Sequence, residues 1–268
     1  MPPVLTSRSK HDFVLQHVNT DSVRTELLKL KTKKATGDDL PALLMKDAAC
    51  IIEKPIAHLI NLTFSTSVIP TDWKEAKATP IYKSWKKNDV NNYRRISVLP
   101  LVSKLMERAV QIQLVSFLSD NSILSTFQSG FRKRHSAETA VVHLVDHILE
   151  HMDIYFIDLK KAFDLVDHAC MLHKLEHLGV RGKDLEWFRN YLTTRSQRVK
   201  YENELSFSLP LDYGVPQGSL LGSLFFVLYI NDLPQCIRNS YINMYADDAV
   251  IYSTGADIMN NVEILKMT

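Results

Sequence analysis

Two adjacent aspartates, Asp247 and Asp248, lie between two apolar, β-preferring runs near the end of the sequence. The pattern from Ile242 to Tyr252 predicts a strand, a tight turn that begins at Ala246, and a returning strand. Two carboxylates at a hairpin tip repel each other, and this repulsion is costly unless a positive charge lies between or beside them. Mg²⁺ is such a charge, because it binds carboxylate oxygens together with substrate phosphates. An isolated pair of this kind is more often an ordinary solvated turn, so the interpretation depends on the rest of the chain.

A third acid, Asp158, ends the short apolar run Tyr155–Ile157, which predicts a strand with this carboxylate at the edge of a sheet. Three acids from two neighbouring strand ends can hold two Mg²⁺ ions about 3.5–4 Å apart, the arrangement used for in-line displacement at phosphorus. One ion would lower the pKa of an attacking hydroxyl, and the other would offset charge on a leaving pyrophosphate. By spacing alone the trio is weak evidence, because Asp158 and Asp247 are distant in sequence.

Two further stretches carry groups that suit a phosphorylated ligand. The turn Gly214–Ser219 opens into an apolar helix predicted for Leu220–Ile230, and Gln217 offers an amide to a base, sugar or phosphate. A simple strand-to-helix turn explains the same residues equally well. Lys83 and Arg94 are cations suited to a triphosphate, although each alone is more often part of a solvated face.

The composition is typical of a folded globular protein of one large or two small domains. The chain has 268 residues and a formal net charge of +2, so its overall charge does not indicate a nucleic-acid binder, although basic residues form separate clusters. Its three cysteines are far apart, which argues against a disulfide framework or a zinc ribbon. No secretory signal is evident, and the most apolar segment is shorter than the roughly 20 residues that span a bilayer.

Strands and helices alternate along the chain, which indicates an α+β or α/β protein with a small mixed sheet packed against several helices. The segments predicted as helices are 21–34, 40–52, 55–67, 101–118, 137–150, 169–178 and 185–192. A strand is predicted at Glu75–Tyr82, and a hairpin over 197–209. In the helix 101–118, Glu107 lies on the polar side, opposite the apolar stripe that contains Leu105.

The order of motifs resembles that of the reverse transcriptase domain of non-LTR (LINE-type) retrotransposons, from about residue 20 to the C-terminus. The motifs, in family order, are Lys34-Ala35-Thr36-Gly37-Asp38, Pro80-Ile81-Tyr82-Lys83, Asn92-Tyr93-Arg94, Ile96-Ser97-Val98-Leu99, Gln128-Ser129-Gly130-Phe131-Arg132, Phe156-Ile157-Asp158 through Ala162-Phe163-Asp164, Gly214–Ser219 and Tyr245-Ala246-Asp247-Asp248. Such an ordered set is far more specific than one pair of acids.

The resemblance implies an α+β right-hand polymerase with a small, mainly antiparallel palm sheet packed on helices. Fingers would cover roughly 21–150 and a partial palm roughly 151–268, after a poorly defined N-terminal segment, 1–20. Asp158 and Asp247 would be the principal metal ligands with Asp248 beside them, and two Mg²⁺ ions would bind, with Mn²⁺ as a possible substitute. The chain ends before the family's later palm motif and thumb, so we expect the thumb to be missing and processive synthesis to be lost.

The resemblance also implies roles in binding nucleotides and nucleic acid. Lys83 and Arg94 would hold the incoming triphosphate, and Gln217 would line the nucleotide pocket. Phe163 matches a steric gate that crowds a ribose 2′-hydroxyl and so favours dNTPs. Three residues would contact template or primer: Gln128, Arg132 and Tyr245. The basic segment Arg195–Lys200 would add looser phosphate contacts.

Several residues depart from the family pattern. Arg95 stands where proline is usual, which removes a restraint that keeps Arg94 extended. Trp85 replaces the glycine of a Lys-Ser-Gly turn and would be strained if that turn needs a positive φ. Ser223 replaces a proline early in a helix, which is a mild change. Residues His151–Asp153 join the predicted helix to the following strand more abruptly than is usual, which shortens the strand that leads to Asp158.

The leading hypothesis is an RNA-directed DNA polymerase domain that uses an RNA template, a DNA or RNA primer, dNTPs and Mg²⁺, with no membrane and no defined protein partner. The family implies an intracellular location, nuclear or cytoplasmic. A second hypothesis is a truncated or repurposed, inactive fragment that only binds nucleic acid. A metal-dependent nuclease is disfavoured, because it leaves Gln217, Phe163 and the cations without roles.

Overall fold

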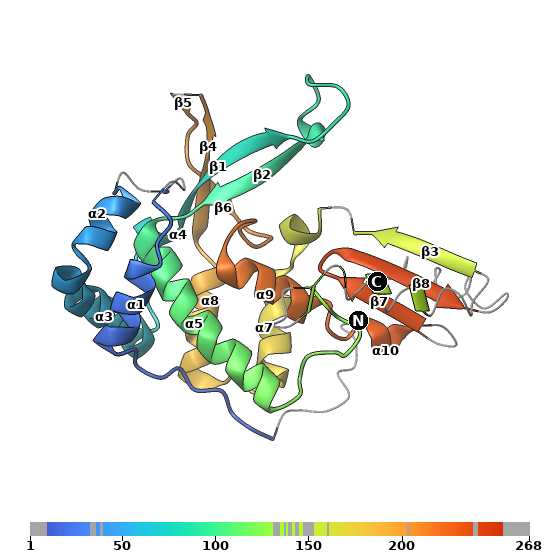
Figure 1. Ribbon diagram of the computed structural model, residues 1–268, viewed down its shortest axis with the longest axis horizontal. Helices are drawn as coiled ribbons and strands as arrows, with labels where there is room; N and C mark the ends of the chain where they lie inside the picture. The colour runs from blue at the N-terminus through green and yellow to red at the C-terminus, as the bar shows by residue number, and fades with distance from the viewer. Residues whose placement is uncertain are drawn as a thin grey trace.

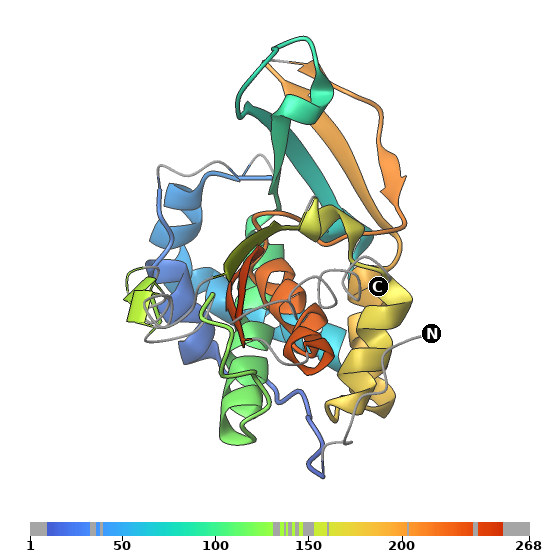
Figure 2. The same cartoon turned by 90° about the vertical axis from the view of Figure 1, so that its right-hand side faces the viewer.

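The computed structural model describes residues 10–32, 36–37, 40–130, 135–136, 138, 141–142, 145–146, 153–159, 161–202, 204–237 and 241–253. The described chain forms a body of helices, a larger sheet that projects from that body, and a smaller three-stranded sheet (Figure 1). Turning the molecule by a quarter turn shows the larger sheet projecting again, so the protrusion is not an effect of one viewpoint (Figure 2).

The helical body holds the main apolar core. Its helices are α1 (Thr20–Leu28), α2 (Ala42–Asp47), α3 (Ala49–Thr66), α5 (Leu101–Asp120), α7 (His168–His177), α8 (Gly182–Leu192) and α9 (Leu220–Tyr229). Helix α9 is apolar on every side and is almost wholly buried, as a helix without a polar face must be. Against it pack the aromatic residues of α8, with Phe188 and Tyr191 each edge-on to Phe225.

The larger sheet is mixed. Its strands are β1 (Glu75–Tyr82), which follows the short helix α4 (Thr71–Lys74), β2 (Tyr93–Val98), β4 (Arg195–Tyr201), β5 (Glu204–Leu205) and β6 (Leu209–Leu211). The order is β2-β1-β4-β5, and β6 also pairs with β4. Strands β1 and β2 form an antiparallel hairpin, whereas β1 and β4 run parallel. A loop containing the 3₁₀ turn η1 (Val90–Asn92) closes the β1–β2 hairpin.

The smaller sheet is antiparallel, in the order β3-β8-β7. Its strands are β3 (Asp153–Asp158), β7 (Tyr241–Tyr245) and β8 (Asp248–Ser253). Alternate residues of the β7–β8 hairpin, Ile242, Met244, Ala249 and Ile251, form a separate buried cluster. Residues beside and within the short helix α10 (Leu233–Cys236) pack against this cluster. The full register from Asp153 to Asp158 shows that the short join before β3 leaves that strand paired along its length.

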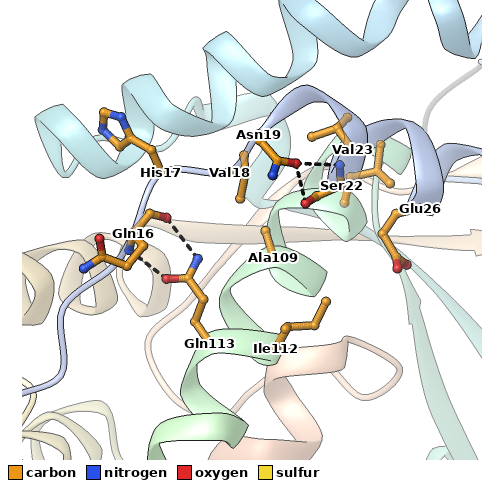
Figure 3. A pocket seen from close by; sticks show the side chains of 11 residues that line it. Gln16, His17, Val18, Asn19, Ser22, Val23, Glu26, Ala109, Ile112 and Gln113 are labelled. Carbon is orange, nitrogen blue, oxygen red and sulfur yellow. Dashed lines mark hydrogen bonds between the residues drawn. The ribbon is translucent and has the colours of Figure 1, made fainter.

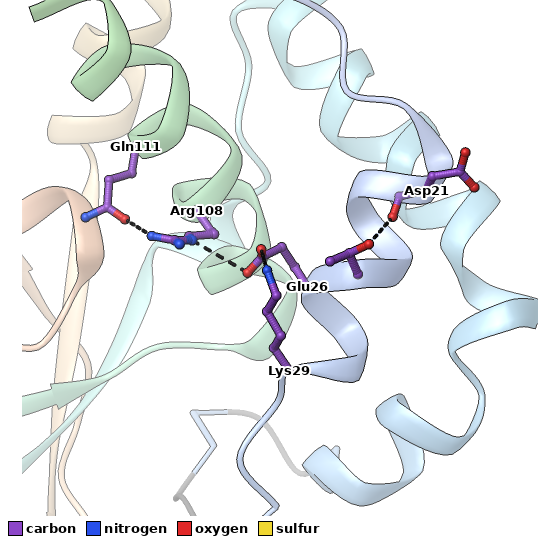
Figure 4. A network of polar contacts seen from close by, with 6 residues as sticks. Asp21, Glu26, Lys29, Arg108 and Gln111 are labelled. Atoms are coloured by element: carbon purple, nitrogen blue, oxygen red, sulfur yellow. Dashed lines mark hydrogen bonds and ion pairs between the residues drawn. The ribbon is translucent and has the colours of Figure 1, made fainter. Parts of the chain in front are cut away.

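The N-terminal segment 1–20 was expected to be poorly defined, yet residues within 10–19 are packed against the helical body. Phe13 and Leu15 are buried, and the Phe13 N–H donates to the Gly179 carbonyl at 2.9 Å. The next element, α1, is tied to α5 through Glu26, whose carboxylate lies 3.5 Å from the Arg108 guanidinium (Figure 4). These ties make the described part of the N-terminal segment a component of the helical body.

Most predicted elements are present, and two differ in an informative way. Strand β1 has the predicted bounds, whereas the break between the helices predicted at 40–52 and 55–67 falls at Ala48, so that Pro55 lies inside α3. The return strand of the predicted hairpin 197–209 is divided into β5 and β6. Of the helix predicted at 137–150, residues 138, 141–142 and 145–146 are described and helical. Its other residues lie outside the described chain.

Together these elements confirm a chain of mixed helix and strand content with a small mixed sheet. Within the described residues, no helix is both long enough and apolar enough to cross a bilayer.

Candidate active site

The predicted acids lie at the tip of the β7–β8 hairpin, where the two-residue turn Ala246-Asp247 joins the strands. Tyr245 pairs with Asp248, so Asp248 opens β8. Ala246 adopts φ 56°, a conformation that non-glycine residues rarely take. Asp247 is half-buried and Asp248 is exposed. The turn therefore presents two carboxylates in succession from a tightly defined backbone.

The register of the smaller sheet brings the third acid to the same place. Asp158 pairs with Asp248 across the β3–β8 ladder, so two positions that are distant in sequence are directly opposite each other. The Asp158 side chain lies outside the described part of the structure. Within that part, the carboxylates of Asp247 and Asp248 have no ion pair or hydrogen bond. Unpartnered carboxylates are hard oxygen ligands, which fit Mg²⁺ or Mn²⁺.

Gln128 holds the turn from beneath, and this corrects its predicted role in touching template. Its side chain is fully buried, and its Oε1 accepts the N–H of Ala246 at 3.0 Å and that of Gly130 at 2.7 Å. Its Nε2 donates to the Ala246 carbonyl at 3.4 Å. The amide thus satisfies backbone groups on both sides of the turn residue and does not face solvent.

The backbone around Gln128 adds a short parallel bridge to β7. The Met244 N–H donates to the Phe127 carbonyl, and the Ser129 N–H donates to the Met244 carbonyl, each at 2.8 Å. Gly130 lies so close to the turn that a Cβ there would be 2.2 Å from the Ala246 nitrogen. The segment 127–130 is therefore fitted to the hairpin at backbone level, and only glycine leaves room at position 130.

A pocket of about 530 Å³ opens beside the turn and is lined by all four residues predicted to bind nucleotide. Its wall includes Asp247 and four residues predicted to bind nucleotide: Lys83, Arg94, Phe163 and Gln217. The other residues that line it are Val90, Asn91, Tyr93, Arg95, Leu159, Lys161, Ala162 and Asp164. The pocket is polar and rich in cations, which suits a ligand with several negative charges.

The cations enter the pocket from both sides. Arg94 lies on β2, where pairing with Ile81 keeps it extended, so the ladder supplies the restraint that the missing proline would have given. Arg95 forms an ion pair at 2.8 Å with Asp164 of the 3₁₀ turn η2 (Ala162–Leu165). Sequence reasoning missed Lys161, which precedes η2 and whose Nζ lies 3.3 Å from the Asn91 Oδ1. Only its position two residues before Phe163 could have drawn attention to it.

Phe163 is hydrogen-bonded to the turn Gly214–Ser219 and packs against the helix that follows it. The Val215 N–H donates to the Phe163 carbonyl at 2.8 Å, and the Phe163 ring lies 4.8 Å from that of Phe226 between centroids. Gly214 has φ 82°, and a Cβ there would lie 2.7 Å from the Asp164 carbonyl oxygen. The ring is thus fixed against α9 at one wall of the pocket.

Gln217 is held by backbone contacts to β2. Its carbonyl accepts the N–H of Ser97 at 2.8 Å, and the Ser219 hydroxyl caps α9 by accepting the Gly222 N–H at 2.7 Å. These contacts fix the backbone of Gln217, which lines the pocket.

A buried glutamate supports the same turn from behind, and the sequence had placed it on a polar helix face. Glu107 of α5 is fully buried, where it accepts a hydrogen bond from the Tyr191 hydroxyl and, at 2.8 Å, from the Leu220 N–H. Burial raises the pKa of Glu107 above its ordinary value, and these hydrogen bonds oppose that rise. The carboxylate therefore ties α5 and α8 to the start of α9.

Three other predicted contacts have different outcomes. Arg132 lies outside the described residues. Tyr245 is partly exposed, at 37%, beside the two acids. Arg195 was expected to contact phosphate, but it is 2% exposed and stacks on the Tyr191 ring at 4.8 Å, so its charge is internal.

A second, more apolar hollow of about 240 Å³ lies between the N-terminal segment, α1 and α5 (Figure 3). Gln16 and Gln113 exchange hydrogen bonds across one end of it, at 2.7 and 3.0 Å. None of the predicted site residues lines this hollow.

Comparisons with known proteins agree with the geometry. Residues 85–267 match the family described as reverse transcriptase (RNA-dependent DNA polymerase). The chain is similar to the RNA-directed DNA polymerase from mobile element jockey of Drosophila melanogaster, with 29% identity over 95% of this chain and 29% of that protein. It is 30% identical to the probable RNA-directed DNA polymerase from transposon BS of the same organism, over 90% of this chain and 28% of that protein. The chain thus spans less than a third of the length of these curated relatives.

Proposed function

Because the chain belongs to the reverse transcriptase (RNA-dependent DNA polymerase) family, we propose that it carries the nucleotide-binding and metal-binding core of an RNA-directed DNA polymerase of a non-LTR retrotransposon. The substrates would be dNTPs, and the partners would be an RNA template and a DNA or RNA primer. In this proposal the β1–β2 hairpin and the helices before residue 150 belong to the fingers, and the chain from about residue 151, with the smaller sheet and its flanking helices, forms part of the palm.

The observation that carries the proposal is the convergence on one pocket. Lys83 and Arg94 of the β1–β2 hairpin, Phe163 after β3, Gln217 before α9 and Asp247 of the β7–β8 turn all line it. These residues come from four separate parts of the chain. An ordinary solvated turn with two acids does not account for the cationic pocket beside it. A binding site for a triphosphate requires cations there, together with acids that can hold a metal ion.

The carboxylates would hold the metal ions, with Asp247 and Asp158 as the principal ligands and Asp248 beside them. Bound Mg²⁺ would supply a lowered pKa for the primer 3′-hydroxyl and offset charge on the departing pyrophosphate. Around it, Arg94 and Lys83 would bind the triphosphate and neutralise its charge. Phe163 would lie against C2′ of the sugar and exclude a 2′-hydroxyl, and Gln217 would also contact the nucleotide.

Primer extension on an RNA template with dNTPs and Mg²⁺ or Mn²⁺ tests the proposal. Asp247→Ala should lower incorporation on the order of a thousandfold, because a lost metal ligand removes several kcal/mol of transition-state stabilisation. Asp47→Ala, which removes an exposed acid at the end of α2, is the matched control and should leave the rate unchanged.

Equal incorporation by the Asp247→Ala variant would overturn the metal assignment. A folded wild-type protein that binds RNA in a salt-dependent way but incorporates nothing would select the alternative, a fragment that binds nucleic acid without synthesis.

A further inference from the structure

The tip of the β1–β2 hairpin carries an indole in full contact with solvent. Trp85 is 87% exposed and has φ 75°, so the residue is both unburied and conformationally strained. The hairpin lies in the sheet that projects from the body of the molecule (Figures 1 and 2). An exposed tryptophan leaves a large apolar surface in water, and a non-glycine residue with positive φ costs roughly 1–2 kcal/mol. Both features are unfavourable for folding, which points to a role in binding.

The loop that presents Trp85 is built to hold its shape. Side chains of the hairpin donate hydrogen bonds to three consecutive carbonyls of the loop. The Tyr82 hydroxyl donates to the Trp85 carbonyl, and the Asn92 amide donates to the Lys86 carbonyl at 2.9 Å. The Tyr93 hydroxyl donates to the Lys87 carbonyl at 2.8 Å. With these carbonyls turned inward, the positive φ at Trp85 is set by the loop.

The surroundings of Trp85 are aromatic and cationic. The Tyr82 and Tyr93 rings lie 5.6 Å apart, and the Lys87 ammonium lies 5.7 Å from the Tyr82 ring centroid. Lys83, Lys86 and Lys87 are all exposed, and none of them forms an ion pair with another described residue. The loop's one acid, Asp89, is occupied in capping η1, where it accepts the Asn91 N–H at 2.9 Å.

We propose that this tip, defined as residues 82–93, binds an unpaired nucleic-acid strand by stacking a base on Trp85 while lysines contact the flanking phosphates. Aromatic faces and mobile cations side by side are the chemistry that holds single strands without regard to sequence. A protein-docking surface would instead need a wider apolar patch without this charge.

The tip is continuous with the active-site pocket, because Lys83, Val90, Asn91 and Tyr93 line that pocket as well. The inference therefore rests on the proposed function in one respect: the strand would be the unpaired template just ahead of the site. Binding at the tip itself requires neither metal nor nucleotide.

Trp85→Gly tests the stacking. Glycine adopts φ 75° without strain, so the variant removes the indole while keeping the loop, and impaired folding is not the expected outcome. With a fluorophore-labelled single-stranded RNA and no metal or dNTP, affinity should fall about 5- to 150-fold, which corresponds to about 1–3 kcal/mol for one stacked base. Trp85→Phe should restore most of the affinity, and Phe207→Ala, which removes an equally exposed aromatic ring elsewhere, should leave it unchanged.

The charges are tested through the dependence of affinity on salt. Removing two phosphate contacts with the double variant Lys86→Ala, Lys87→Ala should lower the slope of log affinity against log salt by about 1.4, since each contact contributes about 0.7 on single strands. The double variant Lys46→Ala, Lys54→Ala removes the same charge from α2 and α3 and is the control. The same titration with single-stranded DNA of identical sequence shows whether the tip distinguishes RNA from DNA.

Affinity equal to wild type in Trp85→Gly would overturn the inference even if primer extension succeeds. Binding that depends on Trp85, in a protein that incorporates no nucleotide, would uphold it and refute the polymerase function instead. The two proposals can therefore fail separately.

Discussion

Phe163 is where a single ring should decide which sugar the site accepts. Its carbonyl is fixed by the Val215 N–H and its ring by Phe226, so it cannot easily swing away from a ligand in the pocket. A fixed wall discriminates by contact, whereas a mobile one would yield to a 2′-hydroxyl. The rigidity of this wall, rather than the mere presence of an aromatic residue, is the structural basis for expecting dNTP preference.

Phe163→Val should therefore relax sugar selection. Removing the ring opens space for a 2′-hydroxyl, and the ratio of dNTP to NTP incorporation should fall about tenfold or more, in the range that a pocket contact usually contributes. Single-nucleotide incorporation with each substrate measures the ratio. An unchanged ratio in a folded variant would show that another residue excludes the hydroxyl. Urea unfolding serves as the control, because loss of the ring should lower stability by about 1–3 kcal/mol.

At the scale of elements, the turn that carries the acids is held by a segment far from it in sequence. Gln128 binds both backbone groups of Ala246, and its neighbours bridge to β7. The sequence showed the two motifs but not their contact, since hydrogen bonds between a side chain and a distant backbone leave no periodic signal. The template contact expected of Gln128 came from the family resemblance alone, which carries no sign of its contact with the hairpin.

Gln128→Ala should impair catalysis by displacing the turn. The Ala246 and Gly130 N–H groups would lose their acceptor in a buried place, which costs about 1–3 kcal/mol. As a positioning residue, Gln128 should affect kcat more than the KM for dNTP, because the triphosphate cations are untouched. Gln128→Glu keeps an acceptor oxygen for both N–H groups but loses the Nε2 donor to the Ala246 carbonyl, so it should recover only part of kcat. Equal losses in both variants, or a change in KM alone, would contradict this role.

Element bounds were predictable where one face is buried and failed where packing overrode a local rule. β1 was predicted to the residue because Ala76 and Ala78 alternate with polar neighbours, as a half-buried strand requires. Pro55 was expected to begin a helix, yet α3 begins at Ala49. The buried residues Ala49, Ile56 and Ile60 of α3 lie on one face of the helix, and this face continues past Pro55. Tertiary packing of that face outweighs the hydrogen bond that Pro55 cannot donate.

For the whole molecule, the least predictable feature is an ionisable group in the core. Glu107 was assigned to the solvent side of its helix, because a single helix shows only which face is more polar. The structure surrounds that face with Tyr191, Leu220 and the buried Arg195. The sequence thus indicated the family, the class and most of the pocket, but not how its helices enclose one another.

Glu107 should make the stability of the whole domain depend on pH. Its raised pKa means that the folded protein keeps a proton that the unfolded chain releases, so the free energy of unfolding should fall as pH rises above the ordinary glutamate pKa of about 4.3. Glu107→Gln has no proton to release, while an amide oxygen can still accept the Leu220 N–H, and its stability should be less sensitive to pH in that window. Urea unfolding of both proteins at a series of pH values makes the comparison, and parallel curves would show that Glu107 does not titrate as described.

The acids lie on the part of the molecule with the smaller apolar core. Among the described residues, the cluster beneath the β7–β8 hairpin consists of Ile242, Met244, Ala249 and Ile251, whereas the helical body buries a much larger set. Regions with few buried contacts open at lower free energy than the rest of a protein. On warming, the hairpin should loosen before the helices melt. Loss of activity and loss of helical structure would then occur at different temperatures, with heat inactivation setting in while the domain is still largely folded.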